Sequence, residues 1–296
     1  MNLIIGATGI LGGEICHLLT AGGKPVKAMV RKTSDQAKIN KLKELGVQII
    51  EGDLRDNSTF GPALEGVATV ITTAASIPFS YVPGENDIEK VDHEGMKNFI
   101  DAAGVAGVGH FVYTSFSGNI DLDFPLRNAK RAVEQHLQKS GMLFTILRPG
   151  YFMEAWLTAA VGFDVANAKV QLCGNGTKPV SYISYMDVAR FAAESLDNPA
   201  AKNAILELGG TEQLSQLEAV NIFEEVCGRK FEVLNIPEIA LQTQLDEAVD
   251  PMQKSFISLM LCAANGDPIN MENVLQAFPI TMTSVRDYAH RVTTAS

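Results

Sequence analysis

The chain has 296 residues, a formal net charge of −10 at pH 7, 46% hydrophobic residues and 20% charged residues. This length is sufficient for one large α/β domain or for a main domain with a smaller lobe. The acidic balance, without a long basic run, excludes a typical nucleic-acid-binding surface. No apolar run is long enough to span a membrane and the start lacks the features of a signal peptide, so we expect a cytoplasmic protein that does not enter membranes.

The four cysteines lie far apart and lack the paired spacing of a metal site. They are Cys16, Cys173, Cys227 and Cys262. Without a secretion signal, cysteines of this kind are expected to be reduced thiols. The sequence therefore predicts neither a bound metal nor a disulfide.

Short β-rich segments alternate with helical segments through the first half of the chain. The predicted strands are 2–6, 26–30, 47–53, 67–72, 110–115 and 143–148, and the predicted helices are 10–21, 34–45, 57–65, 89–106 and 127–140. This alternation is typical of a Rossmann-like, doubly wound parallel sheet of the α/β class. After residue 150 the alternation loosens, with strands at 168–172, 179–184, 204–208 and 231–235 and helices at 185–197, 214–227, 238–263 and 285–292. We expect a nucleotide-binding domain over 1–150 and a smaller α+β substrate lobe over 151–296, interleaved with the first domain.

The first strand is followed at once by a glycine-rich loop that opens a helix. The loop and first helical residues are Gly6, Ala7, Thr8, Gly9, Ile10, Leu11 and Gly12. In such a strand, loop and helix, the first glycine permits the tight turn, the second lets the backbone approach a pyrophosphate, and the third lets helix pack on strand. The N–H groups and the positive dipole end of the helix then face the phosphates. These seven residues are predicted to bind a dinucleotide.

The end of the second strand selects the nucleotide in such a site. An acidic residue there binds the ribose 2′-hydroxyl of NAD, whereas a basic residue accommodates the 2′-phosphate of NADP. This chain has Arg31 and Lys32 at that place, followed by Thr33 and Ser34, and no acid before Asp35. Arginine binds phosphate in a bidentate manner. The sequence favours NADP(H) over NAD(H); the alternative is a basic turn that contacts only solvent.

The ends of the third and fourth strands complete the predicted cofactor site. Asp53 is expected to accept a hydrogen bond from the adenine amino group, and Leu54 to pack on the adenine ring. Thr73, Ala74 and Ala75 follow the fourth strand, and their small side chains let a dinucleotide lie close to the backbone. Taken alone, each segment could equally be a strand end with turn-forming residues.

Aromatic residues indicate the substrate side. Tyr151 and Phe152 directly follow the sixth strand and are expected to contact the nicotinamide. The candidate substrate residues are Phe79, Tyr81, Phe152, Trp156 and Tyr182. Large apolar and aromatic side chains that line a cleft suit a planar or lipophilic substrate. The alternative is that these side chains form core where the two parts of the chain meet.

Together these segments resemble the NmrA-like family of atypical short-chain dehydrogenase/reductases, which includes isoflavone-type reductases and some quinone oxidoreductases. The matching segments are IGATGILG (5–12), MVR (29–31), GDL (52–54), AGVGHFVYTS (106–115), KRAVE (130–134), TILRPG (145–150) and YISYMDVA (182–189). The resemblance implies an NADP(H)-binding fold with a small C-terminal substrate lobe.

The resemblance also shows a departure from the usual proton donor. Ordinary members of the superfamily use a tyrosine four residues before a lysine on one helix, so that both side chains share a face. By this resemblance the lysine is Lys130, which also contacts the nicotinamide ribose, but Leu126 stands where the tyrosine is expected. Three replacements remain open. Lys130 itself acts as acid or base, as its counterpart is thought to in isoflavone-type reductases; Tyr113 or Tyr151 supplies a phenol; or the substrate takes its proton from water.

The candidate catalytic residues are therefore Lys130, Tyr113 and Ser115. Ser115 lies near the position of the superfamily's catalytic serine, or it simply ends the fifth strand. The alternative for Lys130 is a surface lysine that pairs with Glu134 four residues later.

The sequence predicts an NADPH-dependent oxidoreductase that reduces a quinone, an enone or a similar small apolar or aromatic substrate by hydride transfer. The missing phenol motivates an alternative, a redox sensor that binds NADP(H) and acts with little or no catalysis. A third hypothesis is an assembly factor with a vestigial nucleotide site. We expect a small-molecule substrate and no nucleic acid; a homodimer or a protein partner is compatible with the sensor.

Overall fold

The computed structural model describes residues 1–78 and 80–294 and divides the chain into two compact units. Unit 1 comprises Met1–Ser115, Pro125–Leu147 and Val188–Leu206. Unit 2 comprises Phe116–Phe124, Arg148–Asp187 and Glu207–Ser296. Residues 116–124 thus belong to unit 2 and residues 188–206 to unit 1, each on the other side of the expected boundary at residue 150.

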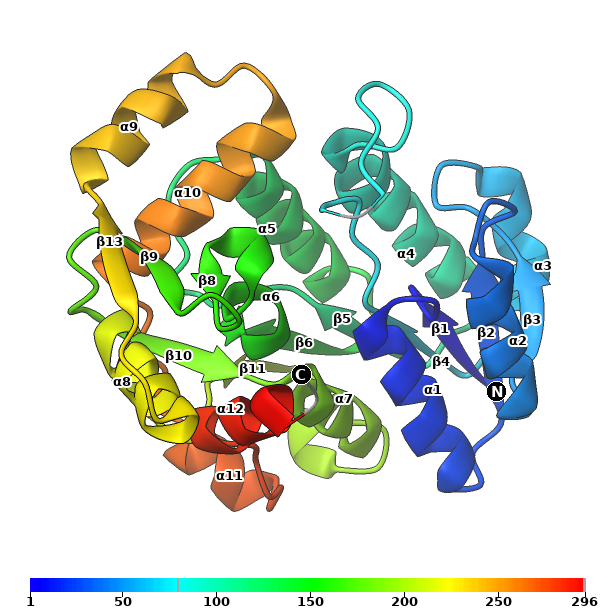
Figure 1. Ribbon diagram of the computed structural model, residues 1–296. Helices are drawn as coiled ribbons and strands as arrows, with labels where there is room; N and C mark the ends of the chain where they lie inside the picture. The colour runs from blue at the N-terminus through cyan, green and yellow to red at the C-terminus, as the bar shows by residue number, and fades with distance from the viewer. Residues whose placement is uncertain (79, 295–296) are drawn as a thin grey trace. The chain divides into compact units, whose positions relative to one another are not determined.

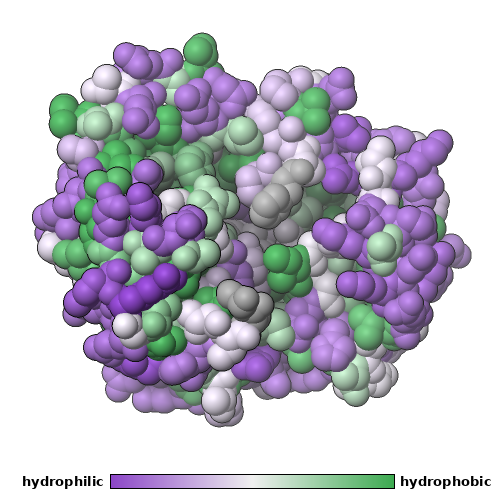
Figure 2. Space-filling model, viewed as in Figure 1, coloured by the Kyte–Doolittle hydropathy of each residue, from purple (hydrophilic) through white to green (hydrophobic). Residues whose placement is uncertain are grey.

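On the face drawn in Figure 2 hydrophilic residues predominate, and hydrophobic residues lie among them at the upper left, over α9 (Glu238–Glu247) of unit 2. Ile239 on α9 and Val249 after it are 75% and 86% exposed. No helix in the described part of the chain is long and apolar enough to cross a membrane. Over the same residues, no group of three or more His, Cys, Asp and Glu side chains is placed to hold a metal ion.

Unit 1 is built on a seven-stranded sheet (Figure 1). In spatial order the strands are β11 (Ala204–Leu208), β6 (Leu143–Pro149), β5 (His110–Thr114), β4 (Thr69–Thr72), β1 (Asn2–Ile5), β2 (Val26–Val30) and β3 (Gln48–Glu51). The pairs from β3 through β6 are parallel, and Ile5 of β1 lies opposite Met29 of β2 and Thr72 of β4. The predicted Rossmann-like α/β fold is confirmed. The strand order reverses between β1 and β4, where folds of this class bind ligands at the carboxyl ends of the strands.

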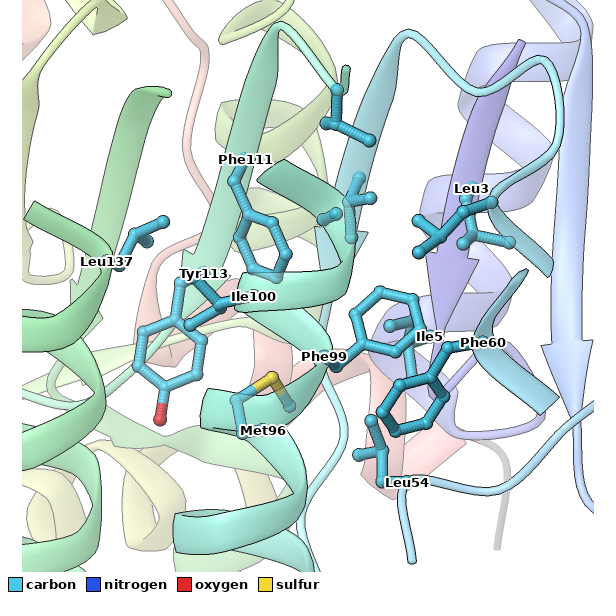
Figure 3. Packing of buried hydrophobic residues seen from close by; sticks show 14 of the residues in the cluster. Leu3, Ile5, Leu54, Phe60, Met96, Phe99, Ile100, Phe111, Tyr113 and Leu137 are labelled. Carbon is cyan, nitrogen blue, oxygen red and sulfur yellow. The ribbon is translucent and has the colours of Figure 1, made fainter. Parts of the chain in front are cut away.

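Helices cover both faces of this sheet because its central strands are apolar on both sides. The helices of unit 1 are α1 (Ile10–Ala21), α2 (Gln36–Glu44), η1 (Asn57–Thr59), α3 (Phe60–Leu64), η2 (Ile88–Gly95), α4 (Met96–Val105), α5 (Pro125–Gln138) and η4 (Pro199–Ala201). One further helix, α7 (Tyr185–Glu194), begins in unit 2 and ends in unit 1. On one face, α3, α4 and α5 bury Phe60, Phe99 and Leu137 against Leu3 and Phe111 of the strands (Figure 3). Helix α1 lies on the other face (Figure 1).

The helix predicted over 89–106 begins with an eight-residue π-helix, η2, that the sequence pattern does not reveal. The π-helix η2 ends at Gly95, where a Cβ atom would lie 2.4 Å from the Lys90 carbonyl oxygen and 2.5 Å from that of Leu54. Any side chain at this position would push the helix away from the loop that follows β3. π-Helical turns are uncommon and often occur at functional sites.

Unit 2 contains two small sheets and several helices. Its strands are β7 (Tyr151–Phe152), β8 (Phe163–Asp164), β9 (Lys169–Cys173), β10 (Pro179–Ile183), β12 (Gln213–Ser215) and β13 (Glu232–Ile236), in the orders β12-β10-β7 and β13-β9-β8. Its helices are α6 (Met153–Trp156), η3 (Ala159–Val161), α8 (Gln216–Cys227), α9 (Glu238–Glu247), α10 (Pro251–Asn265), α11 (Glu272–Ala277) and α12 (Val285–Thr294).

The prediction of one continuous helix over 238–263 is wrong. Asp250 caps α10 by accepting hydrogen bonds from the next turn, and Pro251 at the first helical position ends any continuation from α9.

The glycine loop sets how closely α1 lies to β1. Gly6 has a φ of +86°, a conformation that side chains disfavour, and its carbonyl oxygen accepts a hydrogen bond of 2.9 Å from the Gly9 N–H. A Cβ atom at Gly12 would lie 2.3 Å from the same carbonyl oxygen, closer than any real contact. The loop therefore has no room for a side chain at this position.

We predict that Gly12→Ala destabilises the protein by about 1–3 kcal/mol, as overpacked sites do, because the new methyl group must push α1 away from the loop. Gly13→Ala is the matched control, since its Cβ would lie 3.4 Å from the nearest atom and alanine favours a helix. Urea denaturation of both variants measures the change in free energy of unfolding. Equal stability of the two variants would contradict the close approach.

Candidate functional site

The start of α1 offers uncapped backbone N–H groups at the carboxyl edge of the sheet. Gly9 is the N-cap, and it has no side chain to bond the first turn, which also lacks acidic residues. Such N–H groups remain available to phosphate oxygens. Thr8 is half-buried and Gly9 and Ile10 are exposed, whereas Leu11 and Gly12, which follow them, are buried. The exposed part of the loop therefore offers the backbone at Gly9, with the Thr8 and Ile10 side chains beside it, to a dinucleotide phosphate.

The end of β4 packs directly on this loop. A Cβ atom at Gly6 would lie 2.7 Å from Thr73 Oγ1 and 2.9 Å from the Ala74 nitrogen. The Thr73 N–H donates to the Ile5 carbonyl oxygen at 2.9 Å, continuing the β1–β4 ladder. Ala74 is half-buried and Ala75 is exposed, so both are accessible beside the glycine cradle. The structure brings these predicted cofactor residues together at the point where the strand order reverses.

The Arg31 side chain, at the end of β2, is held in place by a hydrogen bond from one of its guanidinium nitrogens. Its Nη1 donates a hydrogen bond of 3.0 Å to Oδ1 of Asn86, and its backbone N–H donates to Ser34 Oγ at 3.1 Å. Asn86 is itself buried and donates to the Ser80 carbonyl oxygen. Within the described part of the chain no other guanidinium nitrogen of Arg31 makes a hydrogen bond, so donors remain for a phosphate. Lys32 is exposed.

Asp53 after β3 is already bound by a neighbouring arginine. Arg55 donates from Nε to Asp53 Oδ1 at 2.9 Å and from Nη2 to Oδ2 at 2.6 Å. Partial burial raises the pKa of the Asp53 carboxyl, but the hydrogen bonds and charge of Arg55 outweigh it and hold the pKa below its usual value. The predicted hydrogen bond from adenine to Asp53 must therefore share this carboxylate with Arg55. Leu54 is buried beside it.

The three candidate catalytic residues lie together at the end of β5. Lys130 on α5 is only 6% exposed, and its Nζ donates to the Thr114 carbonyl oxygen at 3.3 Å and lies 5.3 Å from the centre of the Tyr113 ring. Ser115 accepts a hydrogen bond of 3.4 Å from Arg131 on the next position of α5. Lys130 is thus a buried residue and not a surface lysine, and Glu134 forms its ion pair with Arg131 at 2.7 Å.

Burial governs the protonation of the Lys130 amine and the Tyr113 phenol. It lowers the pKa of Lys130, while the charges of Asp92 and Glu134 act in the opposite direction. It raises the pKa of the Tyr113 phenol well above its usual value, and Asp92 and Glu134 add to that shift. Figure 3 shows the Tyr113 ring beside Leu137, with its hydroxyl group directed away from the other buried hydrophobic side chains. A phenol in this setting stays protonated and is a weak acid.

Unit 2 contains a cavity of about 390 Å³ with an aromatic and apolar lining. Trp156 packs edge-on against Tyr151 with ring centres 4.8 Å apart, and Phe256 stacks on Trp156 at 6.0 Å. Tyr182 and Cys173 also line the cavity. Aromatic and aliphatic side chains predominate in the lining, and Gln171 and Gln216 add side-chain amides. The Tyr151 hydroxyl is used in a 2.9 Å hydrogen bond to the Leu259 carbonyl oxygen.

Two further predicted substrate residues, Phe152 and Tyr81, do not belong to this lining. Phe152 packs against Tyr185 in a tilted arrangement instead, with ring centres 4.0 Å apart. Tyr81 is half-buried in unit 1, and Phe79 lies outside the described residues. The contacts predicted for Tyr151 and Phe152 with the nicotinamide stay predictions.

Sequence reasoning missed three residues that shape the site. Asn86 holds Arg31, Arg55 binds Asp53, and Asp92 lies buried near Lys130. A signal was present only for Asp92, because Ile88, Asp92 and neighbouring apolar residues share one helical face, where a charge is unusual. Asn86 and Arg55 lie in irregular loops whose paths no periodicity predicts.

The comparison with protein families gives one match over nearly the whole chain. The NmrA-like family matches residues 2–288. A photosystem II assembly factor, Ycf39, of Trieres chinensis is 34% identical over 242 residues, covering 81% of this chain and 73% of the relative. An NAD(P)H azoreductase of Xenophilus azovorans is 33% identical over 232 residues, covering 77% and 74%.

Solved structures share the fold over almost their full length. The quinone oxidoreductase QOR2 of Escherichia coli, complexed with NADPH, has a TM-score of 0.79 at 20% identity, covering 99% of this chain and 100% of the other. AtPrR2 with NADP+ and (+)pinoresinol has a TM-score of 0.81 at 18% identity, covering 98% and 97%. The fold, the glycine loop and the extent of the family match agree: this chain belongs to the NmrA-like family.

Proposed function

We propose that this protein is an NADP(H)-dependent reductase of small apolar or aromatic acceptors such as quinones and enones. The observation that carries the proposal is the glycine cradle of Gly6, Gly9 and Gly12, which has no room for a side chain at Gly6 or Gly12 and lies where the strand order reverses. The azoreductase relative and the NADPH complex of a structural neighbour support the same cofactor. NADPH, when bound, supplies a hydride ion.

Each part of the cofactor has matching residues in unit 1. The N–H groups at the start of α1 would hold the pyrophosphate, and Arg31, kept in place by Asn86, would hold the 2′-phosphate. Thr73, Ala74 and Ala75 leave space beside the backbone, whereas Leu54 is buried in the core of unit 1 and has little side-chain surface left for the adenine. Lys130 would contact the nicotinamide ribose.

Lys130 is the proton donor that the geometry favours. Its ammonium group has three N–H bonds, and the Thr114 carbonyl oxygen accepts one of them. The Tyr113 phenol is a weaker acid because burial raises its pKa well above the usual value. The Tyr151 phenol donates its hydrogen bond to the Leu259 carbonyl oxygen. A lysine whose pKa is lowered by burial is better matched to proton transfer near neutral pH.

The cavity of unit 2 suits a planar apolar acceptor. Tyr151, Trp156, Tyr182 and Phe256 present ring faces and edges to it. Gln216 also lines it, but its side-chain amide is used by the backbone of Cys173, accepting from the N–H at 3.0 Å and donating to the carbonyl oxygen at 3.1 Å. Gln171 adds a second side-chain amide to the lining, which suits a neutral acceptor that carries a carbonyl group.

A second function is supported by the Ycf39 relatives, which are photosystem II assembly factors. In this alternative the chain binds NADP(H) and acts on a protein partner without turnover. The exposed apolar residues Ile239 and Val249 are compatible with such a partner.

Turnover separates the two functions. We expect NADPH oxidation with at least one member of a panel of quinones, enones and azo compounds, measured by the loss of absorbance at the nicotinamide band. Absence of turnover with every acceptor, together with similar affinities for NADP+ and NADPH and a partner captured by cross-linking, would favour the alternative.

We predict that Arg31→Ala weakens NADPH binding by about 1–3 kcal/mol, the usual effect of losing a hydrogen bond to a charged group, and changes NADH binding much less. Calorimetric titration of both nucleotides measures the difference. Arg286→Ala removes the same charge from an exposed ion pair of unit 2 and serves as the control. An equal loss for NADPH and NADH would contradict the role of Arg31 at the 2′-phosphate.

We predict that Lys130→Met lowers kcat by about 10²–10⁴-fold, the range typical of a lost general acid, while NADPH binding weakens only by the loss of one ribose contact. Lys139→Met alters an exposed lysine just after α5 and should leave kcat unchanged. Steady-state kinetics and a binding titration of both variants provide the measurement. Full activity of Lys130→Met would transfer the proton-donor role to a phenol or to water.

A further inference from the structure

Asp92 is a fully buried carboxylate inside the π-helix η2. It is 2% exposed, and its Oδ2 accepts hydrogen bonds from the Ser76 N–H at 3.0 Å and the Ser76 hydroxyl at 2.5 Å. Its Oδ1 is buried and has no hydrogen-bond partner among residues 1–78 and 80–294. A buried carboxylate is strongly disfavoured unless a positive charge compensates it. Burial raises the pKa of the Asp92 carboxyl, whereas the charge of Lys130 and the hydrogen bonds from Ser76 oppose that rise and favour the carboxylate.

Lys130 is the cation that the structure places near it. Helices α5 and η2 pack against each other, and the charges of Asp92 and Lys130 interact. The other charged groups that act on Lys130 lie on its own helix, where Glu134 and Arg131 are paired with each other at 2.7 Å. The neighbouring strand β5 contributes only the neutral Tyr113 phenol. Two carboxylates therefore act on Lys130. Glu134 is paired with Arg131, and Asp92 is the other.

We propose that Asp92 is a positioning residue, whose carboxylate keeps the buried Lys130 amine protonated at the end of β5 and ready to donate a proton. This inference rests on the proposed function, in which Lys130 protonates the reduced acceptor. In that step an N–H bond of the ammonium breaks and an O–H bond forms on the acceptor oxygen of a quinone or enone. The neutral amine then regains a proton from water.

The replacement Asp92→Asn removes the charge and keeps the shape. The amide oxygen can accept both hydrogen bonds from Ser76, and the amide nitrogen takes the place of the unpartnered oxygen. Burial continues to lower the pKa of Lys130, but the opposing charge is gone. Because Lys130 must be protonated to act, we expect the alkaline limb of the kcat profile to move to lower pH by about one unit or more. The acceptor KM should change little.

A second readout follows Lys130 without any turnover. In protein labelled with ¹³C and ¹⁵N at lysine, the ε-carbon resonance of Lys130 is identified by its loss in Lys130→Met. Its titration midpoint should be about one unit or more lower in Asp92→Asn than in the parent protein. Asp101→Asn is the matched control, because Asp101 is an exposed carboxylate on α4 whose partner is His136. This variant should leave both the midpoint and the kcat profile unchanged.

The two readouts separate the inference from the proposed function. An unchanged lysine midpoint in Asp92→Asn overturns the inference, whatever the turnover. A lowered midpoint together with a shifted kcat profile supports it. A lowered midpoint with an unmoved kcat profile shows that Lys130 is not the acid, and this overturns the use of Asp92 in catalysis without touching cofactor binding.

A double-mutant cycle covers the case in which Asp92→Asn folds poorly. If the two buried charges compensate each other, Lys130→Met destabilises the parent protein more than it destabilises Asp92→Asn. The double variant should then unfold at a higher temperature than the additive expectation from the two single variants. Additive changes in unfolding temperature would overturn the coupling of Asp92 with Lys130.

Discussion

The contact between Gly6 and Gly12 fixes the start of α1 against the end of β1, and the dinucleotide site depends on it. With any side chain at Gly12, the helix would move away from the loop, because the Gly6 carbonyl oxygen already lies where a Cβ would be. The same loop touches Thr73, so one backbone contact also sets the position of the segment after β4. The helix N–H groups then stand at the edge where the strand order reverses.

The parallel sheet gathers the remaining candidate site residues at that edge. Carboxyl ends of parallel strands meet on one side, so Arg31 after β2, Asp53 after β3 and Thr114 at the end of β5 come from distant parts of the sequence. Helix α5 adds Lys130, whose Nζ contacts the Thr114 carbonyl oxygen at the end of β5. The site is therefore a consequence of topology, with chemistry supplied by the first residues beyond each strand.

The sequence predicted the parts of this site that obey a local rule. The glycine loop follows from backbone sterics, the strands from apolar runs, and the basic residue Arg31 from its place at a strand end. The partners of these residues obey no local rule. Asn86 reaches Arg31 from a loop 55 residues away, and the π-helical turns around Asp92 depend on the close approach of Gly95 to the Leu54 carbonyl oxygen. Such contacts are set by tertiary packing, which periodicity does not encode.

Buried charges at the end of β5 help to weigh the two proposed functions. Replacing a buried ion pair by apolar residues of similar size is often neutral or stabilises a protein by about 1–4 kcal/mol. A protein that only held a dinucleotide and a partner would gain stability from an apolar residue in place of Lys130 and another in place of Asp92. The structure instead keeps a buried amine, a buried carboxylate and an unpartnered carboxylate oxygen together. Proton transfer is a use for such an arrangement, and partner binding is not, because these groups are not on the surface. Because these buried groups have a use in one proposed function and none in the other, they favour the reductase.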